Sequence, residues 1–352
     1  MNKFNYMAKF GFEQLIYFYD KETGLKGITC IHDTTLGPAL GGTRLWDYAS
    51  EDDASEDVMR LARAMTYKNA VAGLNIGGGK TVLIGNPEKV KSEAYWRAFG
   101  RYVQSLNGRY ITAEDVNTNP DDMDYIAMET NHITGLRRTS GDPSPFTAFG
   151  TYQGIKAACF ERFGSSSLKG LKILVQGVGN VGSYLVKHLI EEKAIVYIAD
   201  IKQASVDKIL ALYDVLVVDP NEIFNFEYDV FAPCALGAIV NDQTIPLFKF
   251  KVLAGAANNV LKEERHGKIL ADKGILYAPD YVINAGGVIN VYQEILGYDK
   301  DEALRKVNKI YDKLLEIFHL AKMQNITPLD AANRIAEERL RVIKNVRSNY
   351  IR

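Results

Sequence analysis

A glycine-rich turn between an apolar strand and a helix restricts the fold of this chain more than any other feature. Residues 176–182 read QGVGNVG and contain the pattern GxGxxG. The apolar run 172–176 leads into this turn, a helical pattern follows it, and Asp200 ends the next predicted strand 21 residues after Gly179. This order of strand, glycine turn, helix, strand and acid predicts a βαβ unit that binds a dinucleotide.

Each part of this turn has an expected role. Gly177 permits a tight turn, Gly179 lets the backbone approach a pyrophosphate, and Gly182 lets the helix pack closely on the strand. Asp200 would accept hydrogen bonds from the adenosine ribose hydroxyls and repel the 2′-phosphate of NADP, which predicts NAD as the cofactor. Lys202 could instead pair with that phosphate, which would favour NADP. The alternative to a dinucleotide site is a glycine-rich turn that stands beside a strand-end aspartate by chance. The other predicted cofactor-binding residues of the turn are Val178, Asn180 and Val181.

Short strands and helices alternate after the middle of the chain, which predicts an α/β fold with a parallel sheet and helices on both faces. The predicted strands are 172–176, 195–199, 213–218, 230–232, 252–254 and 276–277. Before them, the pattern predicts a helix over 55–66 with Ser55 as its N-cap. The triplet Gly77–Gly79 is expected to end regular structure before a strand over 81–84. The length of 352 residues allows two or three domains, and the polar stretch 137–145 is the predicted linker.

The composition excludes several classes of protein and site. With 42 basic and 43 acidic residues, the net charge of −1 gives no field of one sign that would attract nucleic acid or an anionic membrane. The three cysteines form no CxxC pair and the five histidines form no HExxH or HxxxH pair, so neither a metal site nor a disulfide framework is predicted. No apolar run reaches the roughly 18 residues of a membrane span, and the first nine residues lack a signal-peptide core. We therefore expect a cytoplasmic globular protein.

Two lysines and an aspartate in the first part of the chain point to chemistry. Lys68 ends a helical pattern, and Lys80 follows three glycines that would let a substrate approach the backbone. Two lysines near one pocket would each favour the neutral form of the other, which makes one a usable base, and Asp115 could exchange a proton. The segment GGGKT also invites a P-loop interpretation, but Leu74 stands where the first glycine belongs and a strand follows. The alternative is that Lys68, Lys80 and Asp115 are ordinary solvated side chains, as most lysines and aspartates are.

Five segments together resemble the leucine/phenylalanine/valine dehydrogenase family, which forms a wider group of amino-acid dehydrogenases with glutamate dehydrogenase. The segments are 38–44 (PALGGTR), 65–80, 107–115, 233–237 (PCALG) and 281–290 (YVINAGGVIN). The resemblance runs over essentially the whole chain. It implies a homo-oligomeric enzyme that converts an L-amino acid, NAD and water reversibly to a 2-oxo acid, NADH and ammonium. A substrate domain over 1–138, completed by C-terminal helices from about 325 to 352, would be separated by a cleft from a Rossmann domain over 139–324.

The resemblance also implies roles for single residues. Lys68 would hold the substrate carboxylate, with help from the backbone at Gly41 and Gly42. Lys80 would activate the attacking water, and Asp115 would shuttle protons to and from nitrogen. Three further residues, each otherwise a capping or turn residue, are expected at the nicotinamide end of the cofactor: Thr147, Asn258 and Asn284.

The resemblance favours a branched-chain amino acid as substrate, with leucine preferred. Glutamate enzymes hold the side-chain carboxylate with a lysine where this chain has Leu40, so glutamate would be rejected. The other expected lining residues are apolar: Ala113, Val288 and Val291. The segment 112–115 (TAED) resembles leucine-type members, whereas 255–259 (GAANN) and Tyr292 are more similar to members that use aromatic amino acids. The alternatives are deamination of an aromatic amino acid, a non-catalytic NAD-binding sensor and an ATPase.

Overall fold

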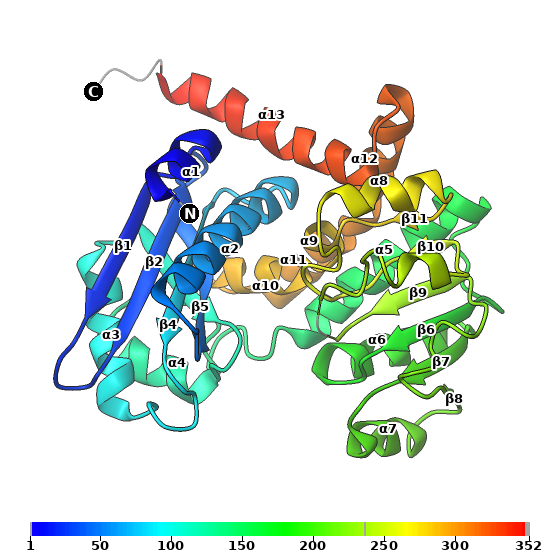
Figure 1. Ribbon diagram of the computed structural model, residues 1–352, viewed down its shortest axis with the longest axis horizontal. Coiled ribbons are helices and arrows are strands. Elements are labelled where there is room, and N and C mark those ends of the chain that lie inside the picture. The colour runs from blue at the N-terminus through cyan, green and yellow to red at the C-terminus, as the bar shows by residue number, and fades with distance from the viewer. Residues whose placement is uncertain (1, 236, 349–352) are drawn as a thin grey trace. The chain divides into compact units, whose positions relative to one another are not determined.

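The structure, a computed structural model that describes residues 2–235 and 237–348, divides into two compact α/β units (Figure 1). Unit 1 consists of Met1–Asp142, Val291–Asp299 and Ala336–Arg352. Unit 2 consists of Pro143–Asn290 and Lys300–Ile335. Each unit has its own β-sheet, and the two sheets differ in topology.

The chain passes between the units partly inside helices. The boundary after Asp142 lies within the predicted linker. Two other boundaries lie within α10 (Gly286–Ile295) and α13 (Pro328–Ser348), because these helices continue from one unit into the other. No change of composition marks a boundary inside a continuous helix. The sequence therefore indicated a return to the first domain at about 325 and did not single out 291–299.

Unit 1 is built on a five-stranded mixed sheet in the order β1-β2-β4-β3-β5. Its strands are β1 (Gln14–Tyr19), β2 (Lys26–Asp33), β3 (Ala39–Trp46), β4 (Gly77–Ile84) and β5 (Tyr110–Glu114). β2 is antiparallel to both β1 and β4, whereas β3 runs parallel to both β4 and β5. In this order β3 separates β4 from β5, with Gly41 and Gly42 of β3 opposite Thr112 and Ala113 of β5.

Helices cover both faces of this sheet (Figure 1). They are α1 (Lys3–Phe10), α2 (Glu51–Val71), α3 (Glu93–Ser105) and α4 (Pro120–Ala127). On one face, Val58 and Met59 of α2 pack on apolar side chains of β2 and β4. On the other face, α3 and α4 bury Trp96, Phe99 and Met123 against the sheet. The sheet is therefore the middle layer of three.

The N-cap of helix α2 lies five residues before the predicted one. It is Ser50, whose hydroxyl accepts a hydrogen bond from the backbone N–H of Asp53 at 3.1 Å. Ser55, the predicted cap, is buried within the helix and donates to the carbonyl oxygen of Glu51 at 2.7 Å. The prediction was wrong because acidic residues fill the first turn and hide its apolar periodicity, although acids there suit the helix dipole.

The three glycines predicted to break regular structure instead form the start of β4. Their missing side chains bring α2 close to the strand, because a Cβ on Gly78 would overlap the backbone nitrogen and the hydroxyl of Thr66. One residue earlier, Gly77 accepts a 2.7 Å hydrogen bond from the side chain of Asn69. The glycines thus allow a close approach between helix α2 and strand β4. A P-loop, which would connect a strand to a helix, is not formed by this segment.

Unit 2 is built on a six-stranded parallel sheet in the order β11-β10-β9-β6-β7-β8. Its strands are β6 (Lys172–Gln176), β7 (Ile195–Ala199), β8 (Leu216–Val217), β9 (Val230–Pro233), β10 (Val252–Leu253) and β11 (Leu276–Tyr277). Its helices include α5 (Ser144–Phe163), α6 (Asn180–Glu191), α7 (Gln203–Leu210), α8 (Arg265–Asp272), α9 (Asp280–Ile283), α11 (Lys300–Asn308) and α12 (Ile310–Gln324). The chain builds outward from β6 to β8 and then returns to β9, which is the doubly wound order of dinucleotide-binding folds.

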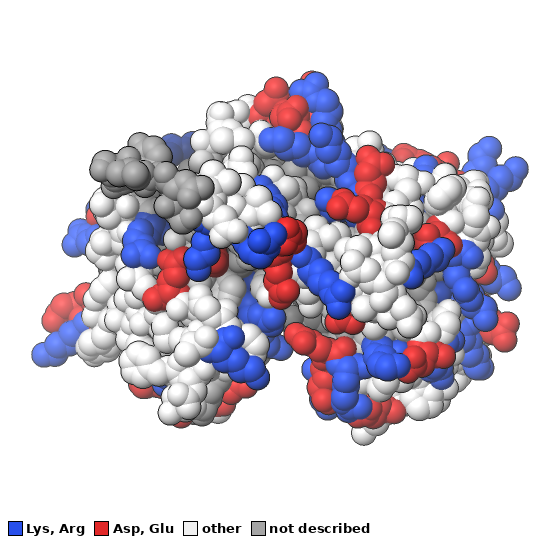
Figure 2. Space-filling view, turned by 90° about the horizontal axis from the view of Figure 1, so that it is seen from above, with Lys and Arg blue, Asp and Glu red and all other residues white. Residues whose placement is uncertain are grey.

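Charged side chains of both signs are interspersed on the surface. Figure 2 shows lysine and arginine beside aspartate and glutamate over the face seen from above. Oppositely charged residues also pair within one helical turn, such as Arg305 with Glu302 and Lys268 with Asp272. Of the helices described, none is long and apolar enough to cross a membrane.

Gly78→Ala is expected to destabilise the protein strongly, because the added methyl group would collide with backbone atoms of Thr66. The expected loss in the free energy of unfolding is about 2–3 kcal/mol, typical of an overpacked core. Gly85→Ala is the matched control, since the atoms nearest to its methyl group would belong to the side chain of Val90, the first at 3.0 Å. Thermal unfolding followed by circular dichroism compares the two variants. Equal melting temperatures would contradict this account of the packing.

Candidate active site

A buried ion pair joins two strands of unit 1. The Nζ atom of Lys80 on β4 lies 2.9 Å from Oδ1 of Asp115, the residue after β5, and only 6% of the lysine side chain is exposed. β3 lies between these strands, and its Gly41 and Gly42 carry no side chain that would separate the pair. A Cβ on Gly42 would lie 2.9 Å from the Cβ of Asp115, and one on Gly41 would overlap the carbonyl oxygen of Gly79. The glycines of β3 therefore make room for the pair.

Asp115 is ionised at neutral pH. Burial alone would raise the pKa of its carboxyl group, but the positive charges of Lys80 and Arg44 outweigh burial and hold the pKa at about 2. Arg44 lies on β3 and donates from Nε to the second carboxylate oxygen, Oδ2, at 3.0 Å. In the sequence, Arg44 is only the last residue of the segment 38–44. Its contact with Asp115 depends on the pairing of β3 with β5, which the sequence does not show.

The other residues predicted to bind substrate are distributed over both units. Lys68 is partly buried in the last turn of α2, the helix that packs on β4. Leu40 on β3 and Val291 on α10 are buried in unit 1, and Ala113 on β5 is partly buried. Val288 belongs to unit 2. Unit 1 thus holds the predicted catalytic pair, the lysine expected at the substrate carboxylate and three of the four apolar lining residues.

In unit 2, the glycine turn follows β6 at its carboxyl end. Gly177 has a φ of +93°, a conformation that residues with a side chain rarely adopt, and a Cβ on Gly182 would overlap the carbonyl oxygen of Gly177. Gly179 is the N-cap of α6, and a Cβ there would meet no atom within 4 Å beyond its chain neighbours and the helix itself. The turn is thus packed tightly at Gly177 and Gly182 and open at Gly179, the N-terminus of α6, where a pyrophosphate would bind.

Asp200 follows β7 and is held toward this turn. Its Oδ2 accepts a hydrogen bond from the backbone N–H of Val178, and its Oδ1 accepts one from Lys202, each at 2.8 Å. Each carboxylate oxygen has a further lone pair, so both could still accept hydrogen bonds from ribose hydroxyls. The structure therefore brings together the glycine turn and the acid, as expected for a dinucleotide site.

Two asparagines of unit 2 fit the amide end of a dinucleotide cofactor. Asn284 is 5% exposed and donates from Nδ2 to Oδ1 of Asn258 at 2.7 Å and to the carbonyl oxygen of Ala256 at 3.1 Å. Its own Oδ1 is buried without a hydrogen-bond partner among the described residues. Such an atom is costly unless a ligand supplies a donor, and a carboxamide N–H would do so. Thr147 is the fourth residue of α5, and its hydroxyl donates to the carbonyl oxygen of Pro143, four residues earlier, at 3.1 Å; it does not cap the helix.

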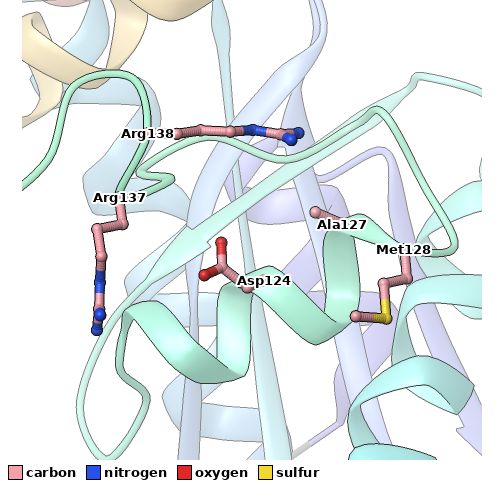
Figure 3. A pocket seen from close by; sticks show the side chains of 5 residues that line it. All are labelled: Asp124, Ala127, Met128, Arg137 and Arg138. Atoms are coloured by element: carbon pink, nitrogen blue, oxygen red, sulfur yellow. The ribbon is translucent and has the colours of Figure 1, made fainter.

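A pocket elsewhere in unit 1 is separate from these residues. It has a volume of about 650 Å³ and is formed by α4 and the chain that leads to the first unit boundary (Figure 3). Its lining residues are Asp124, Ala127, Met128, Arg137 and Arg138. No residue predicted to bind substrate or cofactor is among them, and Arg137 is paired with Asp121 at 2.8 Å.

Three side chains of unit 2 lie close enough together to share a metal ion: Asp242, Glu263 and His266. Arg265 is already paired with this group, at 2.6 Å from Asp242 and 2.9 Å from Glu263. The Nδ1 atom of His266 accepts a 3.0 Å hydrogen bond from the backbone N–H of Glu263. A guanidinium group thus contacts both carboxylates and offsets one of their two negative charges, and we assign no metal to them.

Glu114 on β5 is a second acid in this region, and it was not predicted from the sequence. Burial, followed by the negative charges of Asp142 and Asp122, raises its pKa to about 7. The unfolded chain loses the same proton near the ordinary value of 4.5, so the folded protein holds the proton more tightly between these two values. The group's contribution to stability is therefore complete below pH 4.5 and is lost as the pH rises through 7.

Glu114→Gln removes this titration and is expected to melt at a higher temperature than the parent protein at pH 8, but at a similar temperature at pH 5. The difference between the two pKa values corresponds to roughly 3 kcal/mol at pH 8, and because Glu114 is only partly buried we expect a gain of about 1 kcal/mol, or a few degrees. Glu88→Gln makes the same chemical change at an exposed position of the same unit and is the control. If the parent and Glu114→Gln keep the same difference in melting temperature at both pH values, the assignment of Glu114 is wrong.

Two family models match the chain. The one described as Glu/Leu/Phe/Val dehydrogenase, dimerisation domain, matches residues 13–132, and the one described as Glutamate/Leucine/Phenylalanine/Valine dehydrogenase matches residues 195–347. The chain is 56% identical to leucine dehydrogenase of Thermoactinomyces intermedius, with 100% of this chain and 97% of the relative covered. It is 48% identical to valine dehydrogenase of Streptomyces virginiae, with 94% of each covered.

Solved structures give the same result. L-tryptophan dehydrogenase from Nostoc punctiforme superposes with a TM-score of 0.86 at 47% sequence identity, covering 97% of this chain and 99% of that chain. Glutamate dehydrogenase from Peptoniphilus asaccharolyticus superposes with a TM-score of 0.75 at 25% identity, covering 96% and 92%. These matches confirm the resemblance found in the sequence motifs. The chain belongs to the Glu/Leu/Phe/Val dehydrogenase family.

Proposed function

We propose that the protein catalyses the reversible oxidative deamination of branched-chain L-amino acids, with leucine preferred and NAD as the oxidant. The reaction converts leucine, NAD and water to the corresponding 2-oxo acid, NADH, ammonium and a proton. The observation that carries this proposal is the buried Lys80–Asp115 pair over the glycines of β3, in a chain 56% identical along its whole length to a leucine dehydrogenase.

Three charged side chains of unit 1 would bind the substrate and move its protons. Lys68 would pair with the substrate carboxylate, assisted by the backbone at Gly41 and Gly42. Lys80 would take a proton from the water that attacks the imino carbon. Asp115, which enters the reaction as a carboxylate, would accept a proton from the substrate nitrogen and later return it. Bound NAD would supply the acceptor for the hydride that leaves the α-carbon.

The position of Asp200 supports NAD rather than NADP as the cofactor. Its carboxylate is held beside the glycine turn by two backbone N–H groups, where the 2′-hydroxyl of the adenosine ribose would bind. A 2′-phosphate would bring negative charge against this carboxylate. Asn258 and Asn284 would hold the nicotinamide end, and Thr147 would lie beside it.

The apolar lining residues support an uncharged aliphatic substrate. Leu40 is buried at the position where glutamate enzymes carry a lysine, so the chain offers no cation there for a second substrate carboxylate. Ala113, Val288 and Val291 complete the proposed lining. The 48% identity to an L-tryptophan dehydrogenase keeps an aromatic substrate as the second candidate.

We also propose that the protein forms a homo-oligomer. β1 is the outer strand of the unit 1 sheet, and the side chains of Tyr17 and Tyr19 on it are 48% and 61% exposed. An outer strand has backbone groups that can pair with another strand, and exposed aromatic rings add apolar area for a second copy. The three cysteines are free thiols, which suits the reducing cytoplasm that we propose as the compartment.

Lys80→Ala is expected to lower kcat for leucine deamination by roughly 10²–10⁴-fold, the size of a lost general base. NAD affinity should be unchanged, because the glycine turn belongs to the other unit. Formation of NADH measures the first effect, and a binding titration measures the second. Lys91→Ala, which removes a lysine paired with Asp122 in the same unit, is the control and should keep parental activity. Parental activity in Lys80→Ala would overturn the mechanism.

The substrate class is tested by comparing kcat/KM for leucine, isoleucine, valine, phenylalanine and tryptophan. Leucine is expected to rank above both aromatic amino acids, although the aliphatic substrates should differ little, since one methylene is worth about 1–3 kcal/mol. Rates with NADP in place of NAD should be much lower. An aromatic amino acid at the top would leave the family assignment standing and overturn the proposed roles of Ala113 and Val291.

A further inference from the structure

The two carboxylate oxygens of Asp115 are held by different cations. Lys80 Nζ lies 2.9 Å from Oδ1, and Arg44 Nε lies 3.0 Å from Oδ2. The side chains of Arg44 and Asp115 are each only 20% exposed, so both interactions lie largely out of water. Asp115 therefore has one oxygen facing the proposed catalytic lysine and another that is occupied by an arginine.

Arg44 is itself held in place from a second direction. Its Nη1 lies 3.0 Å from Oδ2 of Asp57 on α2, and the hydroxyl of Tyr48 donates to the same oxygen at 2.7 Å. The other oxygen of Asp57 accepts from the more exposed Arg60 at 3.1 Å. The planar guanidinium group of Arg44 is thus fixed between two carboxylates that come from different elements, α2 and the end of β5.

The charges around Asp115 come from every neighbouring element of the sheet and from α2. Lys80 faces it from β4, Arg44 from β3, and Asp57 lies behind Arg44 on α2. The hydroxyl of Tyr110 on β5 donates to the carbonyl oxygen of Gly41 at 2.6 Å and remains neutral, because burial raises its pKa to about 12. Lys80 is therefore close to one negative charge and, beyond it, to the positive charge of Arg44.

We propose that Arg44, anchored by Asp57, is a positioning residue for the Lys80–Asp115 pair. This inference rests on the proposed function. Arg44 holds Oδ2 and so directs Oδ1 toward Lys80 and the reacting nitrogen. Its positive charge, together with that of Lys80, also keeps Asp115 in the carboxylate form that can accept a proton.

The geometric and the electrostatic effects are separated by two substitutions. Arg44→Lys keeps the charge and loses the planar fork, so kcat for leucine should fall by about 10- to 100-fold. Arg44→Gln also loses the charge that stabilises the Asp115 carboxylate, so its kcat should fall several-fold further than that of Arg44→Lys. KM for leucine should change little in both variants, because Arg44 does not touch the substrate.

Arg60→Gln is the matched control, because Arg60 contacts the same Asp57 and does not contact Asp115. Its kcat and its KM for leucine should be those of the parent protein. Asp57→Asn keeps Arg44 and weakens its anchor, so a smaller loss of kcat is expected there. This variant also tests the proposal if Arg44→Gln fails to fold, which circular dichroism and the melting temperature would reveal.

Three results would overturn the proposal: parental kcat in a folded Arg44→Gln, a loss in that variant that appears in KM and not in kcat, or an equal loss of activity in Arg60→Gln. Failure of the proposed function is seen separately. It would appear as an absence of leucine-dependent NADH formation by the parent protein, before any variant is compared.

Discussion

The burial of one lysine together with one aspartate constrains the whole of unit 1. An ion pair taken out of water is tolerated only if its geometry is good and its remaining hydrogen-bonding groups are satisfied. Lys80 and Asp115 come from strands that are not neighbours, so they can meet only where the strand between them lacks side chains. Gly41 and Gly42 provide this, and the same glycines let β3 pack tightly between β4 and β5. Arg44 gives Asp115 a second cation, so each oxygen of the carboxylate has a positively charged partner.

The arrangement of functional residues in unit 2 depends on the topology of its sheet and not on a single ion pair. All strands of its sheet are parallel, so their carboxyl ends meet at one edge, and residues far apart in sequence gather there. Gly177 after β6, Asp200 after β7 and Asn258 after β10 are brought together in this way. Gly177 also packs against the backbone of Cys234 after β9, where the winding of the sheet changes direction. A dinucleotide site at this edge follows from the fold, and the side chains decide which dinucleotide it accepts.

The sequence predicted those features whose residues are close together along the chain. The strand, glycine turn, helix and acid of unit 2 lie within about thirty residues, so their pattern is local and was read correctly as a βαβ unit. Arg44 could not be assigned, because its partners Asp57 and Asp115 are known only once α2, β3 and β5 are placed. The glycines of β4 were misread as a break, since sequence alone does not show that Thr66 of α2 takes the place of a side chain at Gly78. The segment 291–299 was missed because α10 crosses the boundary without interruption.

The division of the chain between the units has a consequence for its synthesis. Unit 1 opens the chain but is completed only by Val291–Asp299 and by the segment from Ala336 onward, whereas every part of unit 2 has been made by Ile335. A ribosome therefore releases all of the second unit before it releases the last part of the first. The apolar clusters on the N-terminal sheet can therefore form early, whereas unit 1 gains its last helical segment only after all of unit 2 has been made.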